Sequence, residues 1–150
     1  MHKRQLKKPD GRDLILYGRA PLEHGEATAA GLAGDRASHL RYHPLRGEWI
    51  VYAGHRQNRT FLPPPEWNPL APAHDPAHPT EVPAGNWDVA VFENLFSALG
   101  SKSGAAPSLG VDTKPCGGTC EVVVFTQDPR GSLSSLPLDH LEIVFAAWAD

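Results

Sequence analysis

Four short segments rich in aromatic and β-branched residues predict the strands of a sheet. They cover residues 12–17, 48–53, 87–92 and 120–126. The second segment lies between Gly47 and Gly54, which is typical of a strand entered from a turn. After Glu121 the fourth segment is apolar on both of its faces. This pattern predicts a central strand that is covered from both sides.

The end of the chain, residues 137–150, predicts one helix. Its large apolar residues recur at offsets of 0, 3, 7 and 10 and form one stripe: Leu138, Leu141, Phe145 and Trp148. Pro137 stands where a first-turn proline is tolerated. We expect such a stripe to need more chain to pack against than Ala149 and Asp150 provide, so the sequence is expected to be cut short.

Irregular connections separate these elements. The chain has 15 prolines and 14 glycines without a collagen-like period, and more than half of the prolines lie between residues 61 and 83. Residues 1–38 contain a Gly/Ala-rich stretch and predict a flexible amino-terminal arm before a domain at 39–150. Because regular βαβ crossovers are lacking, the order of elements predicts an α+β fold with a mostly antiparallel sheet.

The composition of the chain limits the classes of ligand that it is expected to bind. The net charge of −3 gives no broad basic surface for nucleic acid or an anionic membrane, although a few arginines suffice for one small anionic ligand. No apolar run resembles a signal peptide or a membrane span, so a cytoplasmic location is expected. In that reducing compartment the only cysteines, Cys116 and Cys120, are expected to be unpaired and incidental thiols.

Two polar motifs follow predicted strands. Arg56 and Arg59 come directly after the second strand, where two guanidinium groups can converge on one phosphate. The alternative is a solvated, charged turn. Asn94 follows the third strand and can hydrogen-bond a ribose hydroxyl or a phosphate oxygen. Its alternative role is to satisfy its own backbone in a turn.

Metal and catalytic motifs are weak in this sequence. His74 and His78 are four positions apart, but the prolines between and around them exclude the helix that would align them. Cys116 and Cys120 lack the two-residue spacing of a zinc knuckle. The sequence contains no Gly-x-Gly-x-x-Gly, Walker or Gly-x-Ser-x-Gly motif, and no two histidines are separated by one residue.

Taken in order, the segments resemble the galactose-1-phosphate uridylyltransferase family of the histidine-triad superfamily. The most specific piece is Tyr-x-Pro-Leu-x-Gly-x-Trp at residues 42–49, followed by His-Arg. Further matching pieces cover residues 55–64, 79–83, 88–94 and 118–125, and residues 8–17 look like the arm of actinobacterial-type members. The resemblance covers nearly the whole chain from residue 8. It implies a histidine-triad-like (HIT-like) half-barrel of mostly antiparallel strands with a packed carboxy-terminal helix, here incomplete.

The resemblance also implies a site and a mechanism. The family exchanges uridylyl between UDP-glucose and galactose 1-phosphate through a covalent uridylyl-histidine. It implies that Arg56 and Arg59 contact the phosphates and that Asn94 contacts the nucleotide. Phe92 and Leu70 are implied to wall the uracil or the ribose. The expected partners are therefore UDP-glucose or UDP-galactose and a hexose 1-phosphate, with a homodimer or a complementing carboxy-terminal half.

The sequence departs from the family at several positions. Many members bind zinc through a Cys-x-x-Cys pair that Asn68 and Ala71 replace here, and a further zinc histidine has no clear counterpart at residues 106–109. An amide or a methyl group cannot replace a thiolate, so no zinc is expected. Leu95 stands where some members have a polar residue that helps to bind nucleotide.

The family's nucleophile belongs to an Asn-Pro-His-Pro-His type segment beyond the final helix. No catalytic residue is therefore expected in this chain, and the chain alone should not turn over. The alternative function is a catalytically dead remnant that binds a nucleotide sugar or a partner protein. A nucleotide hydrolase of the wider superfamily would also need a histidine triad, and it does not explain residues 42–49.

Overall fold

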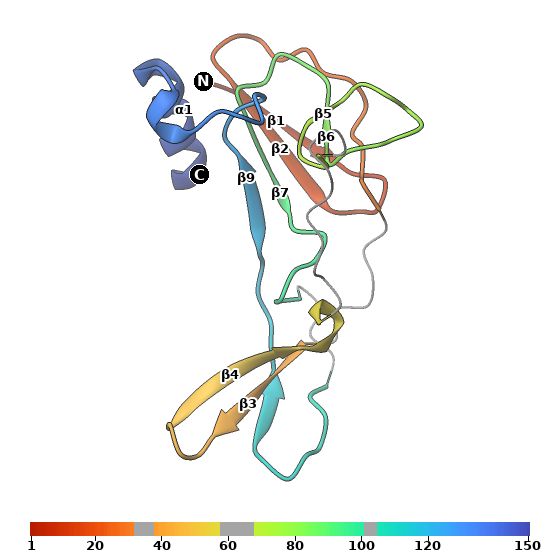
Figure 1. Cartoon of the computed structure of the whole chain (residues 1–150), viewed down its shortest axis with the longest axis vertical. Helices are drawn as coiled ribbons and strands as arrows, with labels where there is room; N and C mark the ends of the chain where they lie inside the picture. The colour runs from red at the N-terminus through yellow and green to blue at the C-terminus, as the bar shows by residue number, and fades with distance from the viewer. Residues whose placement is uncertain (32–37, 58–67, 101–104) are drawn as a thin grey trace. The chain divides into compact units, whose positions relative to one another are not determined.

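The computed structural model describes residues 1–31, 38–57, 68–100 and 105–150. These residues form short sheets that are mostly antiparallel and one α-helix at the carboxy-terminal end, which confirms the α+β class (Figure 1). The chain divides into two compact units: unit 1 is Met1–Leu32, Pro63–Glu93 and Val122–Asp150, and unit 2 is Ala33–Leu62 and Asn94–Glu121. The flexible arm at 1–38 and the domain at 39–150 stay predictions, since each unit combines stretches that are distant in sequence.

The main sheet of unit 1 has the strand order β1-β2-β7-β9. Its strands are β1 (His2–Lys7), β2 (Asp13–Gly18), β7 (Val89–Glu93) and β9 (Glu121–Val124). β2 is antiparallel to both β1 and β7. The turn between β1 and β2 contains Gly11 at φ +84°, a conformation that glycine adopts without the steric cost of a side chain.

The position of β9 corrects one prediction. β9 lies at an edge of the sheet as described, whereas the central strands are β2 and β7. The prediction of a central strand was wrong because an apolar pattern on both faces reports what covers a strand and not how many neighbours it has. Both faces of β9 are indeed in contact with apolar residues: Val124 packs into one core, and Val123 packs against the other.

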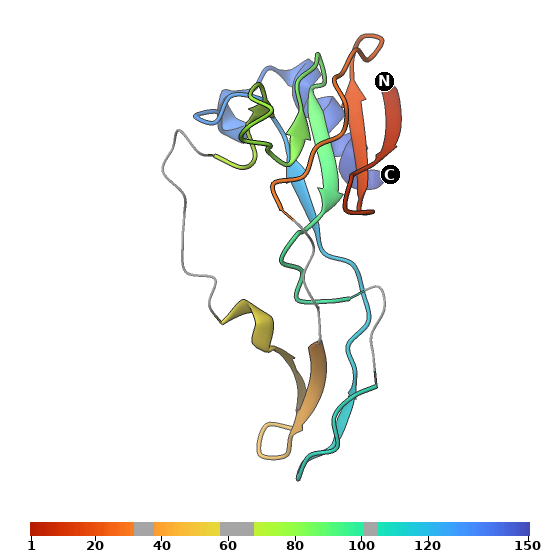
Figure 2. The ribbon, with the colours of Figure 1, turned by 90° about the vertical axis from the view of Figure 1, so that its right-hand side faces the viewer.

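Two cores cover the two faces of this sheet. One core contains Leu14, Leu16, Ala90, Phe92 and Val124, together with Val82 and Trp87 from the stretch of chain that precedes β7. The other contains Tyr17, Val89 and Val91, together with Ile143, Val144 and Ala147 from the helix α1 (Leu138–Ala149). Figure 2 shows α1 behind the sheet. Burial on both faces explains why β7 is nearly continuous in apolar residues.

The helix α1 forms where the sequence predicts it, but it packs through different residues. The predicted stripe is largely exposed: the exposed fractions are 79% for Leu138, 60% for Phe145 and 51% for Trp148. The buried residues of α1 are His140, Ile143, Val144 and Ala147. The helix thus has two apolar sides, and the apolar period alone does not decide which of them faces the sheet.

Unit 2 contains a three-stranded antiparallel sheet in the order β4-β3-β8. Its strands are β3 (Ser38–His43), β4 (Glu48–Ala53) and β8 (Thr113–Pro115). β4 has the bounds that the sequence predicts. Its exposed aromatic rings lie against cations: the Lys114 Nζ is 4.0 Å from the ring centroid of Trp49, and the Arg41 Cζ is 4.0 Å from that of Tyr52.

The proline-rich segment is mostly irregular in its described part, as predicted. One short parallel pair, β5 (Pro72–Ala73) with β6 (Val82–Pro83), joins the middle of this segment to its carboxy-terminal end in unit 1. No helix among the described residues has the length and apolar character that a membrane span requires.

Candidate functional site

The first component of the site is a short 3-10 helix, η1 (Gly54–Arg56), that follows β4 directly. The His55 ring donates a hydrogen bond from Nε2 to the Ser97 carbonyl oxygen at 2.9 Å. This bond attaches η1 to the turn at residues 94–99, while the Arg56 side chain beside it is exposed. In the His-Arg motif, the histidine is therefore an anchor and the arginine is presented to solvent.

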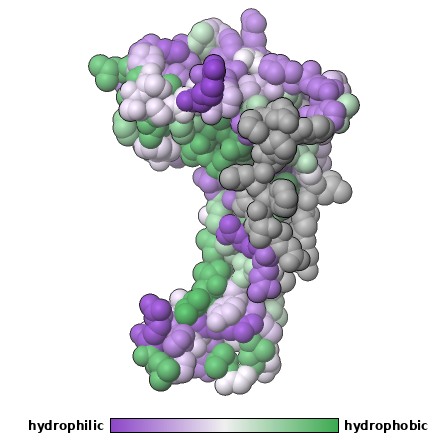
Figure 3. Space-filling model, in the orientation of Figure 1, coloured by the Kyte–Doolittle hydropathy of each residue, from purple (hydrophilic) through white to green (hydrophobic). Residues whose placement is uncertain are grey.

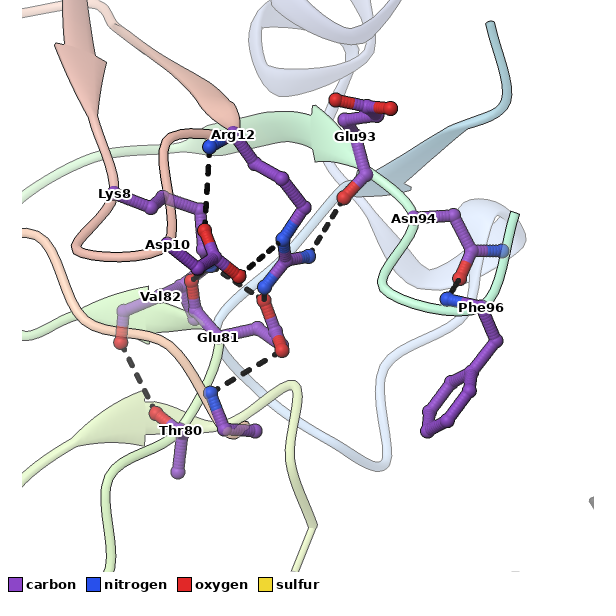
Figure 4. Close-up of polar contacts among 10 residues, drawn as sticks. Lys8, Asp10, Arg12, Thr80, Glu81, Val82, Glu93, Asn94 and Phe96 are labelled. Carbon is purple, nitrogen blue, oxygen red and sulfur yellow. Dashed lines mark hydrogen bonds and ion pairs between the residues drawn. The ribbon is translucent and has the colours of Figure 1, made fainter. Parts of the chain in front are cut away.

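The second component is that turn, which begins at Asn94. The Asn94 N–H donates to the Cys120 carbonyl oxygen at 2.8 Å, and the Ser97 N–H donates to the Asn94 carbonyl oxygen at 3.2 Å. The Asn94 Oδ1 accepts the Phe96 N–H at 2.9 Å (Figure 4). Asn94 thus forms the turn that was the alternative interpretation of its sequence position. Its Nδ2 donates no hydrogen bond within the described part of the chain, so a contact with nucleotide stays a prediction.

The pKa of the Cys120 thiol indicates which groups of this turn favour a negative charge. The pKa of Cys120 is lowered, first by a hydrogen bond from the Ser97 hydroxyl, against the opposing effect of burial. The backbone N–H groups of Leu99 and Ala98 and the positive charge of Arg56 lower the pKa further. A site that favours a thiolate presents donors and positive charge, which are also what a phosphate oxygen requires.

The bond of His55 thus attaches η1, which contains Arg56, to the turn of unit 2 that begins at Asn94. Arg59 falls within residues 58–67, which lie outside the described residues. Sequence analysis missed His55 and Ser97 as the residues that hold this arrangement. The only available signal was the histidine next to Arg56, which local sequence does not connect with Ser97.

The predicted apolar wall belongs to unit 1. Leu70 is 38% exposed and lines a cavity of about 160 Å³ together with Asn68, Ala71 and residues 123–129. Phe92 is 2% exposed in the core, and the Lys8 Nζ lies 4.6 Å from its ring centroid. Leu70 is thus placed at a cavity, whereas Phe92 has a core position, and their contact with a nucleotide stays a prediction.

A buried network of charges in unit 1 was not predicted. Arg12 is 3% exposed and donates in three directions: to Asp10 Oδ2 at 2.6 Å, to Glu81 Oε2 at 2.8 Å and to the Glu93 carbonyl oxygen at 2.7 Å (Figure 4). Lys8 also donates to Glu81, and burial lowers the pKa of Lys8 while its bond to Glu81 opposes that shift. The network joins the β1–β2 turn to the last residue of β7. Its sequence signal, Lys-x-Asp-Gly-Arg, does not reveal the distant glutamate.

The positions of the family's zinc cysteines form a turn in this chain. The Asn68 Oδ1 accepts the Leu70 N–H at 3.0 Å, and the Asn68 carbonyl oxygen accepts the Ala71 N–H at 3.1 Å. Ala71 has no donor atom in its side chain, so these two residues do not fit a zinc site.

The two histidines of the proline-rich segment are exposed. The His78 Nδ1 lies 2.7 Å from Asp75 Oδ2, and this contact lowers the pKa of Asp75. Within residues 1–31, 38–57, 68–100 and 105–150, no group of three or more His, Cys, Asp or Glu side chains is placed to hold a metal ion. The expected loss of zinc itself stays a prediction.

Comparisons with known proteins give this chain a family. The model described as "Galactose-1-phosphate uridyl transferase, N-terminal domain" matches residues 30–150. A galactose-1-phosphate uridylyltransferase of Streptomyces lividans is 32% identical over 167 residues, which cover 100% of this chain and 38% of that protein. The enzyme of that name from Thermotoga maritima is 30% identical, covering 74% of this chain and 34% of that protein.

A third relative of the same name, from Rattus norvegicus, is 27% identical and covers 87% of this chain and 38% of that protein. No solved structure matches the chain. The relatives are transferases, and the chain spans less than two fifths of their length. The chain belongs to the galactose-1-phosphate uridylyltransferase family.

Proposed function

We propose that this chain is the amino-terminal, nucleotide-binding part of a UDP-glucose:hexose-1-phosphate uridylyltransferase of galactose metabolism, with an HIT-like half-barrel fold and a cytoplasmic location. Family membership supports the activity. The observation that supports the binding role is the attachment of η1, which contains Arg56, to the turn that begins at Asn94, together with the effect of the Arg56 charge on Cys120. A guanidinium group and neighbouring N–H donors are the groups that bind phosphate in proteins.

Arg56 is the principal phosphate ligand in this proposal. Its side chain is exposed and has no ion pair with a carboxylate among the described residues, so both edges of the guanidinium plane are available. The bond between His55 and Ser97 fixes the backbone from which Arg56 extends. A cation held in place before the reaction stabilises the charge that shifts onto phosphate oxygens during transfer. Arg59 is proposed as the second such cation.

The remaining contacts would orient the nucleoside. The Nδ2 of Asn94 supplies an N–H donor for a ribose hydroxyl or a phosphate oxygen, while its Oδ1 stays in the turn. Leu70 is proposed to contact the uracil or the ribose, which its place at a cavity supports. For Phe92 the same role has less support, because the core encloses its ring.

The chemistry itself is proposed to need residues from outside this chain. The uridylyl group would be carried by a histidine that these 150 residues do not supply, and a complementing carboxy-terminal half or a homodimer would complete the enzyme. UDP-glucose added to the chain alone should therefore give no covalent adduct by intact mass. The alternative, a catalytically dead nucleotide-sugar-binding or interaction remnant, predicts that supplying the carboxy-terminal half restores no transfer either.

Titration of the chain with UDP tests the binding role. Calorimetry should show binding of UDP and weaker binding of uridine. Arg56→Ala should weaken UDP binding by about tenfold to a hundredfold, the cost of one charge-assisted hydrogen-bonding group. Arg46→Ala is the matched control, because Arg46 is also an exposed arginine of unit 2 but pairs with Glu48 at 2.7 Å. Equal UDP affinity in both variants would refute the site.

A further inference from the structure

The outward side of α1 is apolar although it faces solvent. Leu138, Phe145 and Trp148 are exposed there, and Leu141 is half-buried between them. The rings of Phe145 and Trp148 contact each other edge to face, with 5.4 Å between their centroids. Figure 3 shows hydrophobic atoms at the surface in the region of α1. We call these four residues the outer stripe.

The outer stripe is not needed for the core of unit 1. Ile143, Val144 and Ala147, on the other side of α1, already pack against the sheet. A helix that is apolar on both sides is typical of a buried helix, and a contiguous exposed apolar patch usually marks a contact surface. Trp49 and Tyr52 of unit 2 differ, since Lys114 lies against Trp49 and Arg41 against Tyr52.

The charges along α1 define the edge of this surface. α1 contains Asp139 and Glu142 and has no lysine or arginine. Asp139 pairs with Arg19, whereas Glu142 is exposed and has no ion pair within the described part of the chain. A fitting partner therefore presents an apolar surface with a basic residue beside it.

We propose that the outer stripe is the docking surface for the carboxy-terminal part of a uridylyltransferase chain. The matched family model is that of an amino-terminal domain, and the three relatives have more than half of their length outside the matched part. That remainder is a large body of protein which a complete enzyme contains for every copy of this domain. The inference rests on the proposed function for the choice of partner, and not on the phosphate site.

A binding experiment with purified components tests this docking. The probe is the part of the Streptomyces lividans relative that lies carboxy-terminal to its matched region, mixed with the full 150-residue chain. Light scattering after gel filtration should show a one-to-one complex. Phe145→Ser with Trp148→Ser should weaken the complex at least about thirtyfold, as expected for the loss of central aromatic contacts. Glu142→Lys should weaken it about threefold or more through loss of charge complementarity.

The matched control is Trp49→Ser, which removes a partly exposed aromatic residue from unit 2 and should leave the complex unchanged. Circular dichroism of each variant verifies folding, and if the double variant unfolds, Glu142→Lys decides. Three results would overturn the docking: no complex with the probe, equal weakening by Trp49→Ser, or a dimer of the chain alone that Phe145→Ser and Trp148→Ser dissociate. UDP titration of the double variant stays unchanged if only the docking proposal fails, and UDP binding is absent from every variant if the proposed function fails.

Discussion

Two arginines, one in each unit, differ in burial and in what their guanidinium groups contact. Arg12 in unit 1 is buried, and its guanidinium nitrogens donate to Asp10, Glu81 and the Glu93 carbonyl. Arg56 in unit 2 is exposed and has no carboxylate partner among the described residues. The first arginine uses its donors within the protein, and the second leaves them available.

This difference bears on whether a charged residue stabilises the fold or is available to bind a ligand. A buried charge needs partners in the folded chain, because leaving it unpaired in the interior is costly. An exposed charge without a partner contributes little to folding and can be directed at a ligand instead. Exposure and pairing therefore discriminate between the two arginines, whereas residue type does not.

The largest effect is expected at the buried network. Arg12→Ala leaves Glu81 with one cation in place of two and removes the Arg12 hydrogen bond to the Glu93 carbonyl oxygen. We expect a loss of about 3–5 kcal/mol in the free energy of unfolding, as for other broken buried pairs. Urea denaturation measures it. Lys7→Ala is the control, because the Lys7–Asp13 pair is exposed and should contribute about 0–1 kcal/mol. Equal losses in the two variants would contradict a stabilising role specific to the buried network.

A smaller, mixed effect is expected at Asn94, which forms a turn and is also proposed to bind the nucleotide. Asn94→Ala removes the acceptor for the Phe96 N–H, and this should cost about 1 kcal/mol of stability. It also removes the proposed Nδ2 donor, so the affinity for UDP should fall about fivefold. Asn94→Asp keeps the acceptor and replaces the donor by a negative charge. It should therefore recover stability in denaturation but not UDP affinity, and recovery of both would show that Asn94 has no ligand role.

The smallest effect concerns the pH dependence of Cys120. The thiolate is the nucleophile, and a lowered pKa means that alkylation by iodoacetamide should reach half its maximal rate at a lower pH than for an ordinary thiol. Ser97→Ala should shift this midpoint upward, and Arg56→Ala should shift it upward by less, because Ser97 contributes the larger share. Peptide mass spectrometry separates Cys120 from the buried Cys116. An Arg56→Ala midpoint equal to that of the unmodified chain would place the guanidinium away from the turn.

Much of the fold was predictable from residue patterns alone. β4 has its predicted bounds, and β2, β7 and β9 lie within or beside the predicted segments. β1 was not predicted, because its sequence is mostly charged and exposed and gains its strand conformation by pairing with β2. The strand propensity of a local segment does not show whether that segment will pair with another strand.

The candidate site was predictable in its members but not in its assembly. Arg56 and Asn94 were found as residues that follow strands and match a family. The attachment of η1 to the turn depends on the bond of His55 with Ser97, and the bond of Asn94 with Cys120 holds the turn itself; both bonds join distant parts of the chain. The buried network was not predicted for the same reason, since Lys8 and Glu81 are 73 positions apart in the sequence. Phe92 shows the converse case, in which a strand-end aromatic residue lies in the core.

The placement of β1 has a consequence for how the molecule behaves at high concentration. The outermost strand of a sheet offers free backbone donors and acceptors to a neighbouring molecule, which is a common beginning of aggregation. β1 has the sequence His-Lys-Arg-Gln-Leu-Lys, so a second copy that paired parallel and in register would bring lysine beside lysine and arginine beside arginine. The charge repulsion between copies of β1, the least apolar strand of unit 1, therefore disfavours edge-to-edge polymerisation.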